Sequence, residues 1–379
     1  MIDLLLSNFF LWTNIVIIII FMFYQVVNNK EISLNEFFIQ IFVTIAFLTT
    51  MTALFYLFGT DIYKTEVIST KVVEFKYNEP WTEEYDCSET VCTTNSKGEN
   101  VCHEVHKTCT TRHSKSYYII DSDNDSIIIN ERNFYNAKKQ FGAREKHVHR
   151  YGQTTYSKLK GEGDVWVSKP NILIPVAKEH RYENYLLGSK ETIQKNKGKI
   201  KYQVEKYPKI TNNYYGRIYL DRVINFNQRD LEKKLNILNS KFGKIKQINI
   251  LIYVTDKDKD FKDSLDIAWK GANKNDSVLI LGVRNNKIIW SDSINWSENE
   301  RFGIELERDF SGMSIFDTDK ILNKYKSIIL KYWKRKPMEE TYGYLKTEIE
   351  IPWYLQLLLV LSNLILNYFL FRYFLKNKI

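Results

Sequence analysis

Two runs of alternating aspartates are the residues of this chain whose type and spacing best suit metal binding. The first run is Asp121, Asp123 and Asp125, and the second is Asp256, Asp258 and Asp260. Carboxylate oxygens in such runs are ligands that calcium prefers, but a calcium loop of the EF-hand type also needs glycine at its sixth position and glutamate at its twelfth. The corresponding residues are Ser126 and Arg132 in the first run, and Phe261 and Ile267 in the second. Neither run is therefore an EF-hand.

The two runs differ in their surroundings. The first falls between two short apolar segments and predicts a hairpin turn. The second follows the apolar segment Ile248 to Thr255, a position where open α/β sheets often carry ligand sites. Lys257, Lys259 and Lys262 are interspersed with this second run. These lysines favour a solvated charged turn, with a calcium site as the alternative.

All four cysteines lie in one short segment, at Cys87, Cys92, Cys102 and Cys109. Residues that face each other across an antiparallel hairpin have position numbers with a constant sum. Cys92 with Cys102 gives 194, and Cys87 with Cys109 gives 196. Turn-forming residues lie at the centre, around Gly98. We predict a hairpin over residues 85–112 that is braced by two nested disulfides, with a bulge that absorbs the register difference of two.

Zinc is the alternative to disulfides in this hairpin. Four cysteines allow three pairings, and sequence alone does not choose among them. Thiols and imidazoles also lie close together at Cys102, His103, His106 and Cys109, although their spacing matches no standard zinc module. Disulfides are favoured outside the cytoplasm and zinc inside it. Either role is structural, since a long hairpin has little core of its own.

Other catalytic signals are weak. His147 and His149 alternate on one expected strand, and His180 follows another, a pattern compatible with a metal or acid-base pair. The sequence contains no Gly-x-Ser-x-Gly, no phosphate-binding loop, no dinucleotide-binding loop and no His-Glu-x-x-His. Hydrolase chemistry of the familiar kinds has no support from motifs, and no catalytic residue is predicted.

Two kinds of sequence pattern predict the helices and strands that hold these residues. Residues 60–225 carry short alternating runs separated by turn residues, which predicts a β-rich domain with one helix near Phe134 to Phe141. Residues 226–336 alternate between helical and apolar strand patterns, which predicts an α/β sandwich with a partly parallel sheet. Its helices are expected at Gln228 to Phe242, Phe261 to Gly271 and Asp319 to Lys334. Its strands are expected at Ile248 to Thr255, Ser277 to Val283 and Lys287 to Ile294.

Residues 226–336 resemble the TPM domain. The strand ILIYVT, the helix FKDSLDIAWKGANK and the strand SVLILGV follow the family's order of strand, helix, tryptophan, polar turn and strand. The chain has Asn275, Asp276 and Ser277 where the family usually has Asn-Gly. TPM domains are membrane-tethered and are associated with calcium binding and, in some members, phosphatase activity. The resemblance implies a metal-dependent hydrolase with calcium as the candidate cofactor and the ligands Asp256, Asp258, Asp260 and Asp276. More loosely, uncharacterised membrane proteins of large tailed phages are similar to the end KRKPMEETYGYLKTEIEIPWYLQLLLVL, with WKGANKNDSVLILGV and IIWSDSINWSENERF before it. This likeness implies no function.

Three uncharged apolar runs at the two ends of the chain predict membrane spans. They are Leu4 to Val27, Phe37 to Phe58 and Trp353 to Phe371, with 24, 22 and 19 residues. A helix needs about 20 apolar residues to cross the hydrocarbon core. We therefore predict an α+β membrane protein with three transmembrane helices. A two-helix hairpin comprises residues 1–59, a linker comprises residues 337–352, and the last helix with its basic tail comprises residues 353–379.

Basic residues beside the spans predict the orientation, because they tend to stay in the cytoplasm. Lys30 lies in the loop between the first two spans, and Arg372, Lys376 and Lys378 lie in the C-terminal tail. This places the loop and the tail inside the cell. The N-terminus and the large domain are then expected outside.

The formal net charge of +9 is carried mainly by the large domain. A basic surface outside a membrane is expected to meet the lipid bilayer, anionic envelope components or another membrane protein, and no nucleic acid. The candidate surface-binding residues are Lys334, Arg335 and Lys336. We hypothesise a membrane-tethered extracytoplasmic binding or structural protein, with a TPM-like hydrolase (phosphatase) as the alternative. A cytoplasmic domain would instead favour a zinc hairpin and an anionic partner such as nucleic acid.

Overall fold

The computed structural model describes residues 34–59, 62–94, 100–142, 144–149, 152–153, 157–160, 162–188, 198–349 and 352–376, with five single positions between 16 and 27. The first expected span, Leu4 to Val27, therefore lies almost wholly outside the described residues. The chain divides into two compact units. The first unit comprises Met1–Thr65, Arg181–Lys199 and Lys336–Ile379, and the second comprises Glu66–His180 and Ile200–Arg335. The domain boundary expected at residue 225 falls inside the second unit.

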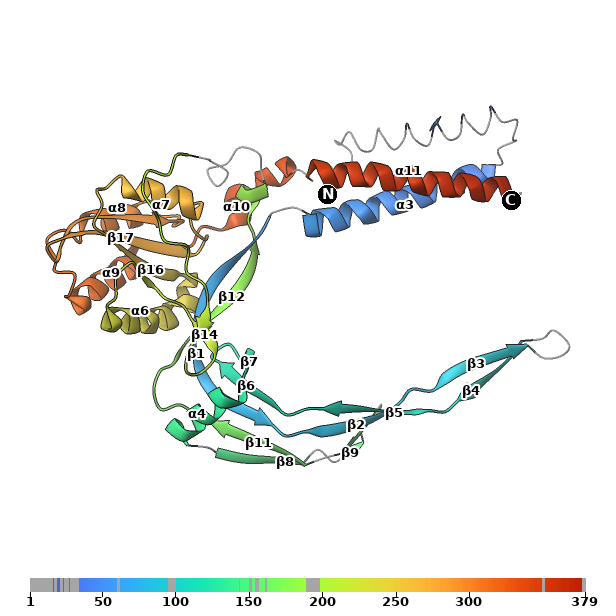
Figure 1. Ribbon diagram of the computed structural model, residues 1–379, viewed down its shortest axis with the longest axis horizontal. Coiled ribbons are helices and arrows are strands. Elements are labelled where there is room, and N and C mark those ends of the chain that lie inside the picture. Colours follow the sequence, from blue (N-terminus) through green and yellow to red (C-terminus); the bar gives the residue numbers. More distant parts are fainter. Residues whose placement is uncertain are drawn as a thin grey trace. The chain divides into compact units, whose positions relative to one another are not determined.

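Two long apolar helices dominate the first unit, α3 (Leu34–Gly59) and α11 (Trp353–Lys376). Each contains a stretch long and apolar enough to cross a membrane, Phe38–Phe55 and Trp353–Phe374. The helices lie side by side (Figure 1). Gln40, near the start of α3, donates from Nε2 to Oδ1 of Asn367, near the end of α11, at 3.0 Å. The two helices are therefore antiparallel.

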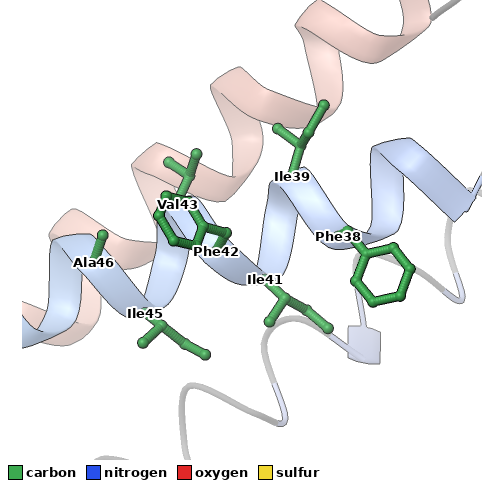
Figure 2. Close-up of a pocket in the computed structure, with 7 residues that line it drawn as sticks. All are labelled: Phe38, Ile39, Ile41, Phe42, Val43, Ile45 and Ala46. Carbon is green, nitrogen blue, oxygen red and sulfur yellow. The ribbon is translucent and has the colours of Figure 1, made fainter.

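One side of α3 carries a continuous apolar surface. Figure 2 shows the residues around a shallow hollow on this helix, which are Phe38, Ile39, Ile41, Phe42, Val43, Ile45 and Ala46. The side chain of Phe42 is among the most exposed, with 75% of the residue's surface accessible. Apolar surface on this scale is unfavourable in water, at roughly 25 cal/mol per Å², but matches a hydrocarbon environment.

Short helices also belong to the described part of the first unit. They are α5 (Tyr185–Gly188), α10 (Met338–Tyr342) and a 3₁₀ helix (Gly343–Glu348). The hydroxyl of Tyr185 donates to Glu339 at 2.7 Å and joins α5 to α10. The expected linker 337–352 is therefore partly helical.

The second unit begins with an antiparallel sheet in the order β7-β6-β1-β11-β8, with β12 paired to β1. The strands are β1 (Tyr63–Asn78), β6 (Ser116–Asp121), β7 (Ser126–Ile129), β8 (Arg144–His149), β11 (Glu162–Ser168) and β12 (Pro175–Glu183). Helix α4 (Glu131–Phe141) begins at Asn130, whose side chain accepts the amide of Asn133, and packs Phe134 into the core with Phe75 and Ile119. The helix expected near Phe134 is confirmed.

A second set of strands extends from this sheet, and we call residues 81–113 the arm. At its base, β2 (Trp81–Asp86) pairs with β5 (Thr108–His113) and β10 (Ser157–Lys160), and β10 pairs with β9 (Gly152–Gln153). At its tip, β3 (Glu89–Thr94) pairs only with β4 (Asn100–Val105) among the described strands. Figure 1 shows β3 and β4 as a two-stranded ribbon that projects beyond the other strands.

The rest of the second unit is an α/β sandwich around a sheet in the order β15-β16-β17-β18. Strands β15 (Val223–Ile224), β16 (Asn249–Thr255) and β17 (Asp276–Arg284) are parallel, and β18 (Lys287–Asn295) is antiparallel to β17. Two further short strands, β13 (Thr211–Asn212) and β14 (Arg217–Tyr219), pair with each other. The expected partly parallel sheet is present.

Helices cover both faces of this sheet. Helices α6 (Arg229–Phe242), α8 (Arg301–Arg308) and α9 (Thr318–Tyr332) pack on one face, and α7 (Phe261–Trp269) packs on the other. Alternate residues of β16 supply the two cores, because successive side chains of a strand point to opposite faces. Ile250 and Ile252 face α6, whereas Leu251 and Tyr253 face α7.

Strand β1 also packs against the sandwich, which explains why one unit contains both parts. A β-carbon at Gly243, in the π-helical segment Gly243–Gln247, would lie 2.5 Å from the carbonyl oxygen of Ser69. Only glycine allows this approach. The backbone carbonyl of Val67 also accepts from the side-chain amide of Asn275 at 2.7 Å.

Candidate functional site

The first aspartate run forms the turn between β6 and β7, as expected. The carboxylate of Asp121 accepts the backbone amides of Asp123 at 2.8 Å and Asp125 at 3.0 Å, which folds the turn around it. Asn124 takes a left-handed conformation with φ of 64°, which asparagine tolerates well. The three carboxylates come within 4.8 Å of one another, the one such acidic group found in the described part of the chain.

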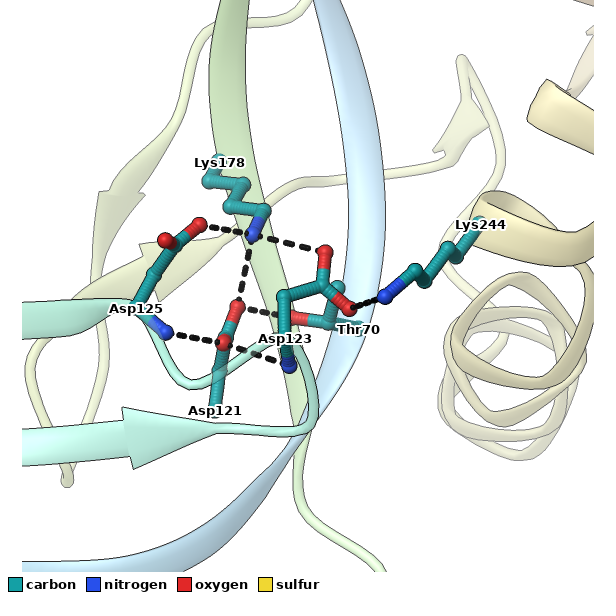
Figure 3. Close-up of polar contacts among 6 residues, drawn as sticks. All are labelled: Thr70, Asp121, Asp123, Asp125, Lys178 and Lys244. Atoms are coloured by element: carbon teal, nitrogen blue, oxygen red, sulfur yellow. Dashed lines mark hydrogen bonds and ion pairs between the residues drawn. The ribbon is translucent and has the colours of Figure 1, made fainter.

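A lysine occupies the centre of this acidic group. The ammonium of Lys178, on β12, lies 2.8 Å from Asp121, 3.0 Å from Asp123 and 2.5 Å from Asp125 (Figure 3). Lys244 approaches Asp123 from the other side at 2.8 Å. We call these five residues the lysine-filled aspartate turn. The ammonium stands where a bound cation would be expected, so the turn carries its own counter-charge.

The pKa values of the turn agree with this geometry. Burial alone would lower the pKa of Lys178, but its hydrogen bonds to the three aspartates outweigh burial and raise it. Burial likewise tends to raise the pKa of Asp123, whereas Lys244 and Lys178 bring it below its ordinary value. Both partners are therefore held in their charged forms at neutral pH, which is the behaviour of a structural ion cluster.

The second aspartate run forms an exposed turn after β16, and each carboxylate there has a neighbour from the protein. Asp256 pairs with Lys257 at 2.9 Å, the hydroxyl of Tyr202 donates to Asp258 at 2.6 Å, and Lys201 donates to Asp260 at 3.0 Å. These contacts are made with three different partners. They support the solvated turn and give no common ligand position.

Asp276 lies at the other end of the sheet, so the four acidic residues of the expected metal site are not brought together. In the parallel pair β16–β17, Asn249 is opposite Asp276 and Thr255 is opposite Gly282. Asp256 follows the carboxyl end of β16, and Asp276 begins β17 at its amino end. Strand β16 has seven residues, so its amino and carboxyl ends are about 20 Å apart at the usual rise per residue of a strand. The expected set of Asp256, Asp258, Asp260 and Asp276 is therefore wrong as one site.

Asp276 instead belongs to a buried polar network. Its carboxylate accepts from the hydroxyl of Tyr207 at 2.9 Å, the side chain of Asn249 at 2.7 Å and the backbone amide of Asn273 at 2.6 Å. Asn249 in turn accepts from the guanidinium of Arg222. These contacts leave the carboxylate enclosed by donors of the protein.

Arg222 is the largest fully buried polar side chain of this network. It donates to Asn236 at 3.0 Å and to Ser69 at 2.6 Å, and so connects α6 to β1. Burial lowers its pKa to about 10, against the opposing effect of the acidic groups around it. Sequence reasoning missed this residue, because an isolated arginine at residue 222 carries no local signal of burial.

The arm contains both nested disulfides, Cys87–Cys109 and Cys92–Cys102. All four cysteines are therefore oxidised to disulfides, and no thiol is left to bind zinc in this hairpin. The expected bulge is absent among the described residues, since Tyr85 pairs with Cys109 and Cys92 pairs with Cys102, both with a sum of 194. The outer disulfide joins residues that are diagonal in the ladder, and its Cα atoms are 5.8 Å apart. A diagonal bridge needs no inserted residue.

The expected surface-binding residues have different roles. Lys334 is exposed and pairs with Glu298 at 3.0 Å. Arg335 donates to the fully buried carboxylate of Glu66, and the ammonium of Lys336 lies 5.8 Å from the ring centre of Tyr342. Arg335 is thus a structural residue, and the triplet does not form one basic patch.

Of the three histidines expected to form a metal or acid-base pair, only His180 has a described side chain. His180 contacts Glu66 through Nδ1 at 3.0 Å, within the same buried ion cluster as Arg335. The backbones of His147 and His149 lie in β8, and their side chains are outside the described part of the structure. No acid-base pair involving His180 and another histidine is found among the described side chains.

Comparison with protein-family models, with curated proteins and with solved structures gives no match. The described clusters of charged residues are filled by the protein's own partners, whereas the arm presents its side chains to solvent.

Proposed function

We propose that this chain is a membrane-tethered binding or structural protein whose large domain, and the arm in particular, faces an extracytoplasmic space. One observation carries the proposal: in the sequence, a disulfide-braced arm falls between two apolar helices of span length, and these two helices pair with each other. Disulfides persist in extracytoplasmic compartments and are rare in the cytosol. Helices of this length and composition suit a bilayer.

The finer parts of the proposal concern topology. We infer three transmembrane helices, with Leu4 to Val27 as the first, an N-terminus outside and a C-terminal tail inside. The antiparallel contact of Gln40 with Asn367 supports one part of this arrangement, namely that α3 and α11 run in opposite directions. It puts the end of α3 and the start of α11 at the same end of the helix pair, as expected if the chain between them lies on one side of the bilayer.

The arm is the part best suited to contact a partner. Most side chains of β3, β4 and β5 are exposed, and the strands have no covering layer in the described structure. A two-stranded ribbon is marginally stable on its own, and the two disulfides compensate for the missing core. Such bracing holds an exposed surface in one conformation, which lowers the entropic cost of binding.

The hydrolase alternative gains no support. A TPM-like identity for residues 226–336 rests on the order of helices and strands alone. The acidic residues that would hold its metal lie at opposite ends of the sheet. We therefore propose no enzymatic activity.

Cysteine labelling in intact cells tests the proposal. A membrane-impermeant maleimide is applied with and without a membrane-impermeant reductant. Labelling only after reduction is expected, because the four cysteines are closed in disulfides and face outward. Free thiols that react only after the cells are broken would place the arm in the cytosol and overturn the proposal.

A matched control reports on the opposite side of the membrane. In a background where all four cysteines are serine, Lys376→Cys puts a single thiol near the end of α11. This thiol is expected to react only after permeabilisation. Labelling of Lys376→Cys in intact cells would contradict the proposed orientation even if the arm were outside.

A further inference from the structure

The tip of the arm has two unlike faces. In the β3–β4 ladder, Cys92 is opposite Cys102, so their disulfide lies on one face of the ribbon. The residues one step along each strand lie on the other face, because side chains alternate. They include Val91 opposite His103, one step from the cysteines, and two steps further along the ladder the same face carries Glu89 opposite Val105. We call these four residues the valine face.

The two valines are diagonal neighbours in the ladder and are open to solvent. Val91 is 37% exposed and Val105 is 38% exposed, and both lie in a sheet of only two described strands. The disulfide face carries Thr90 and Glu104 at the matching positions. Two neighbouring valines on a ribbon with no covering layer in the described structure offer a small apolar contact point, with Glu89 and His103 beside it.

The charge of the arm indicates which kind of partner this face fits. Residues 81–113 contain six acidic and three basic side chains, a net charge of −3 in a chain of net charge +9. The remainder of the chain therefore carries +12. An arm of this sign is repelled by anionic lipid and anionic polymers and is attracted to a basic protein surface.

We propose that the valine face of one copy docks on the basic large domain of a second copy of this chain. This inference rests on the proposed function, because copies tethered in one membrane meet at a high effective concentration. The face is small, so each contact is weak in dilute solution and forms when the copies share a bilayer. The disulfides hold the face in its binding conformation.

Energy transfer between full-length copies in lipid vesicles tests the inference. Donor-labelled and acceptor-labelled chains are reconstituted together in neutral phosphatidylcholine vesicles at rising protein-to-lipid ratio. Val91→Ser with Val105→Ser is compared with a control on the face of the Cys92–Cys102 disulfide, Thr90→Ser. A non-reducing gel verifies that both disulfides are closed in each protein.

We expect saturable energy transfer for the native chain and for the threonine control. The valine variant is expected to need about tenfold more protein for half-saturation, which corresponds to the loss of one or two buried valine contacts. Raising the salt from about 0.1 M to about 0.5 M is expected to weaken association in all three proteins, because it screens the charge attraction.

Three results would overturn the inference. The first is energy transfer no greater than that of unassociated chains. The second is an equal loss of energy transfer in the valine variant and the threonine control. The third is energy transfer that rises with salt concentration. If the copies remain separate while maleimide labelling places closed disulfides outside the cell, docking is wrong and the proposed function stands. If labelling finds cytosolic thiols, the proposed function itself fails.

Discussion

Glu66 and Arg335 are 269 positions apart, yet Nη2 of Arg335 donates to both carboxylate oxygens of Glu66, at 2.7 and 3.0 Å. Glu66 begins the second unit and Arg335 ends it. His180, which ends the first segment of that unit, contacts the same carboxylate at 3.0 Å. Three of the four chain ends of the unit therefore meet at one buried charge.

Loss of Arg335 is expected to destabilise the second unit strongly. Arg335→Met removes the guanidinium that pairs with the fully buried Glu66, and breaking a buried ion pair typically costs about 3–5 kcal/mol. Guanidinium unfolding of the full chain in detergent, followed by tryptophan fluorescence, measures this change in free energy. The double variant Glu66→Gln with Arg335→Met is expected to recover part of it.

The neighbouring lysine gives a matched control. Lys334 has a side chain that is 70% exposed and pairs with Glu298 at the surface, so Lys334→Met is expected to cost less than about 1 kcal/mol. Equal effects of Lys334→Met and Arg335→Met would refute the structural role that we give to Arg335.

Removal of Lys178 is expected to uncover a cation site. In Lys178→Met the carboxylates of Asp121, Asp123 and Asp125 lose their shared counter-charge, so the variant is destabilised. Calcium is expected to restore part of the thermal stability, by about 2.7 kcal/mol at a hundredfold excess over its dissociation constant. The native chain is expected to show no shift of its melting temperature with calcium. A native chain that calcium stabilises equally would show that Lys178 does not fill the cation position.

The same turn predicts a loss of stability in acid. The pKa of Asp123 is lower in the folded protein than its ordinary value, because Lys244 and Lys178 outweigh its burial. A group of this kind stabilises the fold above its unfolded pKa, about 4, and loses that contribution as the pH falls through its folded pKa. Unfolding free energies measured below pH ~4 are expected to fall less steeply in Asp123→Asn than in the native chain. Parallel profiles would contradict the assignment.

Local patterns predicted the strands of the α/β sandwich and the helix α4, because periodicity and turn residues act over a few positions. The nested disulfides were also predictable, since the cysteines are nearly symmetric about one turn. The lysine-filled aspartate turn was only half predictable. Its hairpin was evident from the sequence, but Lys178 comes from a strand more than fifty residues away.

The error at Asp276 has a physical cause. The expected metal site required Asp256 and Asp276 to meet, but one follows a strand and the other precedes its parallel neighbour. Neighbouring parallel strands have all their carboxyl ends at one end of the sheet and all their amino ends at the other end. The predicted parallel sheet was therefore incompatible with the predicted ligand set.

The inner disulfide is expected to protect the tip of the arm without supporting the sandwich. Cys92→Ser with Cys102→Ser opens a bridge between residues ten positions apart, and short loops of this kind typically contribute about 3 kcal/mol. Limited proteolysis is expected to cut the variant faster within residues 89–105, while tryptophan fluorescence reports an unchanged unfolding midpoint for the sandwich. A lowered midpoint would show that the tip supports the larger core.

The last prediction concerns the contact between the two apolar helices. Gln40→Leu removes the hydrogen bond to Asn367, which itself donates to Asn363 at 2.9 Å and is fully buried. Hydrogen bonds between helices in a bilayer contribute about 0.6 kcal/mol on average and up to about 1.7 kcal/mol. The expected loss is therefore small but measurable by unfolding in mixed micelles of rising detergent strength.

A threonine on the same helix provides the control. Thr49 donates to the carbonyl of Ile45 in its own helix, so Thr49→Ala removes a polar group without affecting the contact with α11. Gln40→Leu is expected to lower the stability of the helix pair and Thr49→Ala to leave it unchanged. If Gln40→Leu stabilises the pair, burial of apolar surface rather than the polar contact holds α3 against α11, and the argument for antiparallel pairing through Gln40 and Asn367 loses its energetic basis.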